Sequence, residues 1–210
     1  MESGLSAGEI RLKLVRWFWC SVFGQAYENS PNSQAAKDFA EVSKWIMEGI
    51  VPSDVASFSF EPASLYEVTP KQRALYSGVI ALILSNHSRD FHSLSVLTRA
   101  LMEENNVDDH HIFPDKHLQE AGVKESKRRD CVLNRTLIDR ATNQILSRRA
   151  PGDYFAEMKA KLGAAQFNKL TGSHMLPEEA DSTLLRNDYD GFLDWRCNEI
   201  GNAISEVTNN

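Results

Sequence analysis

Two histidines stand side by side near the middle of the chain, followed by two apolar residues and a proline: His110-His111-Ile112-Phe113-Pro114. A neutral imidazole can take a proton from a water molecule or offer a lone pair to a metal ion. Neighbouring strand residues point to opposite faces, unless a bend such as the one Pro114 can impose brings them together. One histidine could then hold a cation while the other addresses a water beside it.

Two asparagines follow. Asn134 lies in the apolar run 132–138, which we expect to form a return strand, and Asn143 lies one turn into a helix that Asp139 is expected to cap. A helical loop over 115–121, closed by Gly122, would join the strands. This order would bring the Asn143 amide oxygen back over the hairpin. Oxygen and imidazole ligands suit a hydrated divalent ion, Mg²⁺ or else Mn²⁺, Ni²⁺ or Zn²⁺, which can stabilise the charge that develops on a phosphodiester.

These residues resemble the ββα-metal (His-Me finger, or HNH) nuclease motif. The resemblance implies that His110 and Asn143 are metal ligands, that His111 is the general base, and that Asn134 orients the base through a backbone contact. The spacing of nine between the asparagines is that of the family. The first ligand is His rather than the commoner Asp, as in colicin-type nucleases. Asp109 remains open between orienting a ring N–H and ending a strand.

A wider similarity connects this chain to the C-terminal region of GmrSD-type proteins. It includes Trp-Phe-Trp-Cys near the start, Ser-Arg-Asp-Phe before the motif, Ala-Pro-Gly-Asp-Tyr-Phe after it, and the closing Phe-Leu-Asp-Trp-Arg-Cys. The resemblance implies a modification-dependent restriction or phage-defence nuclease that acts on DNA. It also implies a nucleotide-hydrolysing sensor, as an N-terminal domain or a partner protein, outside this chain.

The charge distribution is uneven. The net charge of −6 argues against a nucleic-acid partner, but the window 124–149 holds eight basic and three acidic residues. It carries +5 and leaves −11 on the rest, so a local patch could contact phosphates. A solvated face is the alternative for such a run. The candidate phosphate contacts are Lys127, Arg128, Arg129, Arg135, Arg148 and Arg149.

Helical periodicity dominates outside the motif, which predicts a mostly α protein with a small ββα insert, of class α+β. We expect helices over 10–27 and 33–47, the second stopped by Gly49, and a third from Thr69-Pro70 to about residue 85. Pro151 is expected to start another, and a last one spans about 189–207. A short strand is expected at 57–60.

The expected organisation is a helical subdomain (1–100), the nuclease motif (101–150) and C-terminal helices (151–210), packed as one compact domain. Three isolated cysteines predict free thiols and a cytoplasmic setting, and no apolar segment is long enough to span a bilayer. The cluster His87, Asp90 and His92 is interpreted as a loop rather than a ligand set.

Two other functions stay open. One is a non-catalytic DNA- or protein-binding module on an HNH scaffold. The other is a helical interaction domain in which the two histidines are incidental.

Overall fold

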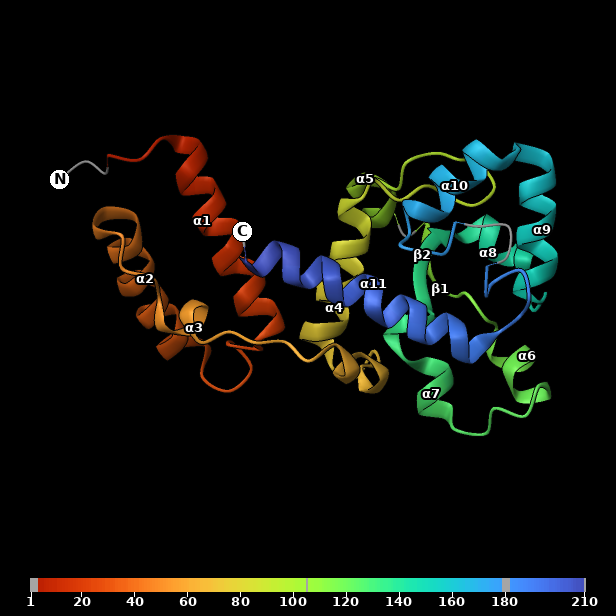
Figure 1. Ribbon diagram of the computed structural model, residues 1–210, viewed down its shortest axis with the longest axis horizontal. Coiled ribbons are helices and arrows are strands. Elements are labelled where there is room, and N and C mark those ends of the chain that lie inside the picture. Colours follow the sequence, from red (N-terminus) through yellow and green to blue (C-terminus); the bar gives the residue numbers. More distant parts are fainter. Residues whose placement is uncertain (1–3, 105, 179–181, 210) are drawn as a thin grey trace. The chain divides into compact units, whose positions relative to one another are not determined.

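The structure is a computed structural model that describes residues 4–104, 106–178 and 182–209. It is mostly helical with a two-stranded antiparallel sheet, which confirms the α+β class (Figure 1). The described residues form two compact units, one up to Glu61 together with the residues from Gly201 onward, the other Pro62–Ile200. The expected division into three segments stays a prediction. Every helix in the described ranges is too short or too polar to cross a membrane.

The first unit is built on α1 (Ala7–Phe23), α2 (Pro31–Glu48) and α3 (Ser53–Ala56). Ser6 and Glu9 form a capping box at the start of α1. Gly49 ends α2 as expected, in a left-handed conformation with φ +80° that favours glycine. The core is a cluster of Cys20, Trp45 and Val55.

The prediction of a short strand at 57–60 is wrong. That segment is irregular: Phe58 packs on the cluster of this unit, and the ring of Phe60 lies 5.7 Å from that of Phe23. The two phenylalanines of this segment therefore pack within the first unit without forming a strand.

The second unit opens with a 3-10 helix, η1 (Pro62–Glu67), and α4 (Arg73–Ser85). The expected start of α4 at Thr69-Pro70 is wrong by three residues. The backbone N–H and the hydroxyl of Thr69 both donate to the Gln72 side chain, at 3.0 and 2.9 Å. These bonds close a turn, and the helix begins only after it. A short helix, α5 (Arg99–Glu103), follows with Thr98 as its cap.

The sheet pairs β1 (Val107–His111) with β2 (Arg135–Asp139), and His111 lies opposite Arg135. The connection holds α6 (Asp115–Glu120), α7 (Ser126–Asp130) and the 3-10 helix η2 (Val132–Asn134). The return strand begins three residues later than the predicted start at 132, because the 3-10 helix η2 occupies residues 132–134. Asn134 therefore precedes the strand rather than lying in it. Gly122 follows α6 with φ +91°, as the expected closing residue of that loop.

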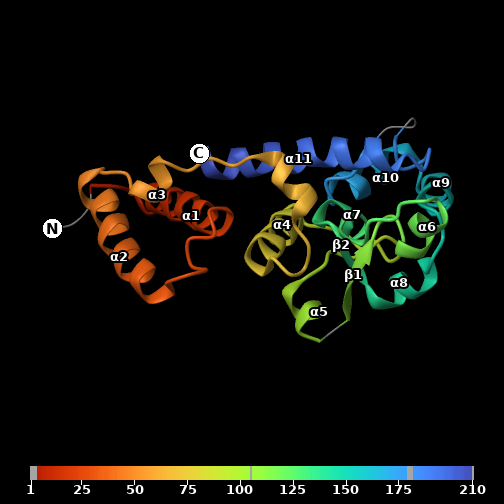
Figure 2. The ribbon, with the colours of Figure 1, turned by 90° about the horizontal axis from the view of Figure 1, so that it is seen from below.

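The helix after the hairpin is α8 (Arg140–Leu146). Asp139 caps it as expected, since its carboxylate accepts from the Ala141 N–H at 2.7 Å. The helix packs on both strands, so hairpin and helix form a ββα arrangement (Figure 2).

Three further helices complete the unit's framework: α9 (Pro151–Leu162), α10 (Ala164–Gly172) and α11 (Tyr189–Asn209). Pro151 begins α9 as predicted. The fully buried Tyr154 donates its hydroxyl to the Ile112 carbonyl at 2.6 Å, so α9 is tied to the chain just after β1. The last part of α11, from Gly201, belongs to the first unit.

Candidate functional site

The strand β1 presents alternate residues to its two faces. Asp108 and His110 share one face with the Asn143 side chain from α8. Asp109 and His111 share the other, where they meet groups from α4, α7 and β2. The neighbouring histidines therefore lie on opposite faces of β1 with different partners, so the strand does not show the bend that was expected to bring them together.

On the first face, His110 Nδ1 lies 2.8 Å from Asn143 Oδ1, and Asn143 Nδ2 donates to Asp108 at 3.1 Å. A carboxylate only accepts hydrogen bonds, so the amide nitrogen must face Asp108 and the amide oxygen must face His110. The predicted ligand pair is thus brought together from strand and helix.

The His110 ring is 2% exposed and lies between Phe91 and Tyr154, at centroid distances of 6.2 and 6.3 Å. Burial lowers its pKa to about 4, an effect that the bond to Asn143 only partly offsets. The ring is therefore neutral at pH 7, the form that can ligate a metal. Its Nε2 is buried without a hydrogen-bond partner in the described ranges.

An imidazole nitrogen and an amide oxygen are donor types that a hydrated divalent ion takes. Because Asn143 Oδ1 accepts the hydrogen of His110 Nδ1, an ion bound by both atoms would replace this hydrogen bond, with the ring hydrogen on Nε2. The carboxylate of Asp108 holds the amide in place. No group of three or more His, Cys, Asp or Glu side chains that could hold a metal ion occurs among the described residues. A site made from His110 and Asn143 would thus leave several positions to water, as Mg²⁺ prefers.

On the second face, His111 Nε2 lies 2.9 Å from Asp130 Oδ1 at the end of α7. The His111 side chain is 25% exposed, so water can reach it. Burial and the positive charge of Arg135 lower the pKa of His111, while Asp130 opposes the shift. A neutral, accessible ring at pH 7 can act as a general base.

Arg135 binds the acidic groups of this face together. Its guanidinium donates to Asp130 and lies 3.4 Å from Asp109. Asp109 also accepts from the Tyr76 hydroxyl. The structure thus places Asp109 against Tyr76, which donates a hydrogen bond to it, and against Arg135, with which it forms an ion pair, rather than against a histidine ring nitrogen.

Asn134 is fully buried and uses its whole side chain on the backbone. Its Oδ1 accepts from the Phe113 N–H at 2.8 Å, and its Nδ2 donates to the carbonyls of Phe113 and Arg129, both at 2.9 Å. Phe113 lies two residues after His111, and Arg129 directly precedes Asp130. Asn134 therefore fixes both sides of the His111–Asp130 pair.

Most of the predicted phosphate contacts are paired with acidic side chains. Lys127 donates to Glu67, Arg128 pairs with Asp190 at 2.6 Å and Arg149 with Glu157 at 2.7 Å.

Two other cations of the set are buried at 8% exposure: Arg135, described above, and Arg129. Arg129 donates to Asp115 at 2.6 Å and to the carbonyls of Val123 and Lys124, so it ties the loop between α6 and α7 together. Arg148 is exposed and has no ion pair with a described residue.

Sequence reasoning missed Asp130, which stands among basic residues with nothing in its spacing to mark it, and left Tyr76 unmentioned. It interpreted Asp90 only as part of a loop. Asp90 does lie in a loop, but it is 1% exposed and accepts from the Asp139 N–H at 2.9 Å and the Thr142 hydroxyl at 2.8 Å. It thus anchors the start of the helix that carries Asn143.

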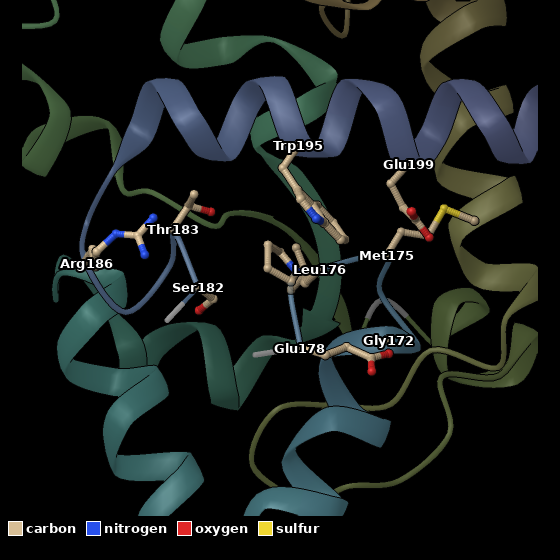
Figure 3. Close-up of a pocket in the computed structure, with 10 residues that line it drawn as sticks. Gly172, Met175, Leu176, Glu178, Ser182, Thr183, Arg186, Trp195 and Glu199 are labelled. Carbon is tan, nitrogen blue, oxygen red and sulfur yellow. The ribbon is translucent and has the colours of Figure 1, made fainter. Parts of the chain in front are cut away.

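A pocket of about 550 Å³ lies beneath α11 in the same unit. Figure 3 shows Trp195 and Glu199 reaching from α11 toward Leu176 and Met175. Neither predicted metal ligand lines it, nor do His111 and Asn134. The three cysteines are buried and form no disulfide with one another, as predicted.

Comparison with known proteins gives one similar sequence. The uncharacterized protein MJ0686 of Methanocaldococcus jannaschii is 35% identical over 151 residues, which cover 70% of this chain and 25% of that protein. The match thus spans about a quarter of the relative's length. No protein-family profile matches this chain. No solved structure matches it.

Proposed function

We propose that this chain is a metal-dependent endonuclease of the HNH class that nicks or cleaves DNA. The observation that carries the proposal is the contact of His110 with Asn143 across the hairpin and helix, at 2.8 Å, with the accessible His111 next in the strand. A strand residue and a helix residue 33 positions apart meet as donors of the types that a hydrated divalent ion takes.

The reaction uses His111 as the base. His111 removes a proton from a water molecule, the water oxygen attacks phosphorus, and the bond from phosphorus to the leaving oxygen breaks. The leaving oxygen takes a proton from solvent, which balances the step. His110 and Asn143 would hold the divalent ion, which when bound would supply positive charge for the phosphate and the leaving oxygen.

Asn134 keeps the base in place in this scheme. It bonds the backbone beside His111 and beside Asp130, so the main chain on either side of this pair cannot shift without breaking buried hydrogen bonds. A general base contributes only when it stands within hydrogen-bond reach of its water. A rigid hairpin end is therefore part of the proposed chemistry.

DNA would be held through its backbone, with little sequence preference. Exposed or half-exposed cations near the hairpin are Lys127, Arg128, Arg148 and Arg149, and three of these exchange an intramolecular acid for a phosphate on binding. Arg129 and Arg135 are buried and would act by holding the site together.

The proposed setting is bacterial or archaeal defence against foreign DNA in the cytoplasm, by restriction. The archaeal relative is about four times as long as the matched region, which leaves room in such a protein for a sensor. We propose that a nucleotide-hydrolysing sensor domain or partner protein licenses cleavage.

A non-catalytic DNA- or protein-binding module is the second candidate. It is favoured by the burial of His110 Nε2, which keeps this ring nitrogen from reaching a metal ion. Such a module would bind without consuming its partner.

A plasmid assay separates the two. Supercoiled DNA is incubated with the protein and Mg²⁺, Mn²⁺, Ni²⁺, Zn²⁺ or EDTA. We expect nicked or linear circles with at least one metal and none with EDTA. Retention of DNA on a gel without nicking in any metal would favour the binding module.

A further inference from the structure

The hydrogen bond between His111 and Asp130 decides which ring nitrogen is free. Nε2 of His111 lies 2.9 Å from Asp130 Oδ1, whereas Nδ1 has no hydrogen-bond partner in the part of the chain that the structure describes. A histidine acts as a base through the nitrogen that lacks a proton, and the bond made by the other nitrogen selects it. The identity of that nitrogen is therefore set by Asp130.

Asp130 can only accept this bond. Burial raises the pKa of its carboxyl, but the hydrogen bond from His111 and the charge of Arg135 outweigh it and hold the pKa below the usual value. Arg135 donates to the same carboxylate oxygen. An ionised carboxylate has no hydrogen to give, so the shared hydrogen must sit on Nε2.

We propose that Asp130 is a positioning residue that holds His111 with its hydrogen on Nε2, so that Nδ1 takes the proton from the attacking water. The inference rests on the proposed function for the role of Nδ1. A carboxylate at this distance also stabilises the imidazolium that forms when the proton arrives.

The surroundings keep Asp130 in place for this task. Asn134 bonds the carbonyl of the residue before Asp130, and Arg135 lies opposite His111 in the sheet register. Arg135 in turn contacts Asp109, which is held by Tyr76. The ring, its carboxylate and the arginine thus form one connected group, in which a change at Asp130 acts directly on His111 and on Arg135.

The test is the tautomer of His111, read from ring ¹⁵N shifts of the full chain in metal-free solution at a pH where the ring is neutral. The His111 signals are assigned by their absence in His111→Gln. We expect the hydrogen on Nε2 in the parent protein and a mixture of both tautomers in Asp130→Asn. A parent ring with its hydrogen on Nδ1, or a tautomer unchanged in Asp130→Asn, would overturn the proposal.

Single-turnover nicking gives the second readout. Asp130→Asn should cut the rate about tenfold to a hundredfold with little change in DNA affinity, because only the orientation of the base is lost. Glu103→Gln removes a carboxylate from an exposed pair with Arg99 and is the matched control. Full activity of Asp130→Asn beside an inactive His111→Ala would contradict the proposal. The tautomer is measured without DNA or metal. Absence of nicking by the parent protein would therefore contradict the proposed nuclease activity but not the proposed hydrogen bond from His111 Nε2 to Asp130.

Discussion

Replacing Asn134 with alanine should damage stability and site together. The substitution leaves three buried backbone groups without their partners: the N–H and carbonyl of Phe113 and the carbonyl of Arg129. An abandoned buried group costs about 1–3 kcal/mol, and water entering the small cavity recovers part of that. We expect the free energy of unfolding of the Pro62–Ile200 unit to fall by about 4 kcal/mol, a large effect for one residue.

The assay is urea unfolding of the full chain followed by circular dichroism, with amide exchange at Phe113 as the local probe. At about 2–4 °C per kcal/mol, the same loss lowers the Tm of this unit by roughly 8–16 °C. Asn134→Asp keeps the acceptor for the Phe113 N–H but sets a carboxylate against two carbonyls, so it should destabilise comparably. Asn106→Ala removes an exposed asparagine side chain and is the control.

A free energy of unfolding of Asn134→Ala within about 1 kcal/mol of the parent value would refute the reasoning, because Asn134 would then contribute no more than one hydrogen bond to stability. Loss of nicking with unchanged stability would also contradict it, since the proposed effect on His111 runs through the backbone.

Four further outcomes are expected. In a thermal shift assay, Mn²⁺ at a hundred times its Kd should stabilise the parent protein by about 2.7 kcal/mol. His110→Ala and Asn143→Ala should each remove that stabilisation, whereas His117→Ala should keep it. Stabilisation that survives in His110→Ala would show that His110 is not a ligand. The buried His174, bonded to Thr136 and to the Arg89 carbonyl, has its pKa lowered to about 4 mainly by burial. The unfolded ring, with a pKa of about 6.5, takes up its proton first, so stability is present above that pH and falls by about 3 kcal/mol as pH drops toward 4. Acid titration of unfolding should show a shallower fall in His174→Gln, and an equally steep one would exclude His174. Arg148→Ala should reduce the salt slope of DNA binding by about 1 with unchanged stability, as filter binding would show. Arg129→Ala should lower the unfolding free energy by about 2 kcal/mol in urea unfolding, because three hydrogen bonds of a buried guanidinium are lost while the partly exposed Asp115 is solvated.

Local patterns predicted the parts of the fold that depend on neighbouring residues. Gly49, Asp139 and Pro151 mark the helix ends where the structure has them, because caps and left-handed turns are set by the residue itself. The start of α4 was placed too early because the side chain of Gln72 bonds Thr69 and closes a turn, a competition that a Thr-Pro signal does not reveal.

The pair His110 and Asn143 could be predicted because both lie in short elements with a fixed order, in which one helix must return over one hairpin. Asp130 could not, since its position beside His111 depends on the path of the loop through α6 and α7. The basic window shows the same limit. Its partners Glu67, Asp190 and Glu157 lie 8 to 62 positions away in sequence. Counting charges along the chain therefore gives a positive excess in the window, although these acidic side chains pair with its cations in the fold.

The measurement that tests the central claim most directly compares initial nicking rates of the parent, His111→Ala and His117→Ala, each purified identically, in the metal that supports activity. His117 lies on α6 and has no part in the proposed reaction. We predict that His111→Ala loses at least about a hundredfold in rate, the contribution of a general base, while His117→Ala keeps the parent's activity. Equal rates for His111→Ala and the parent would contradict the assignment of His111 as the base.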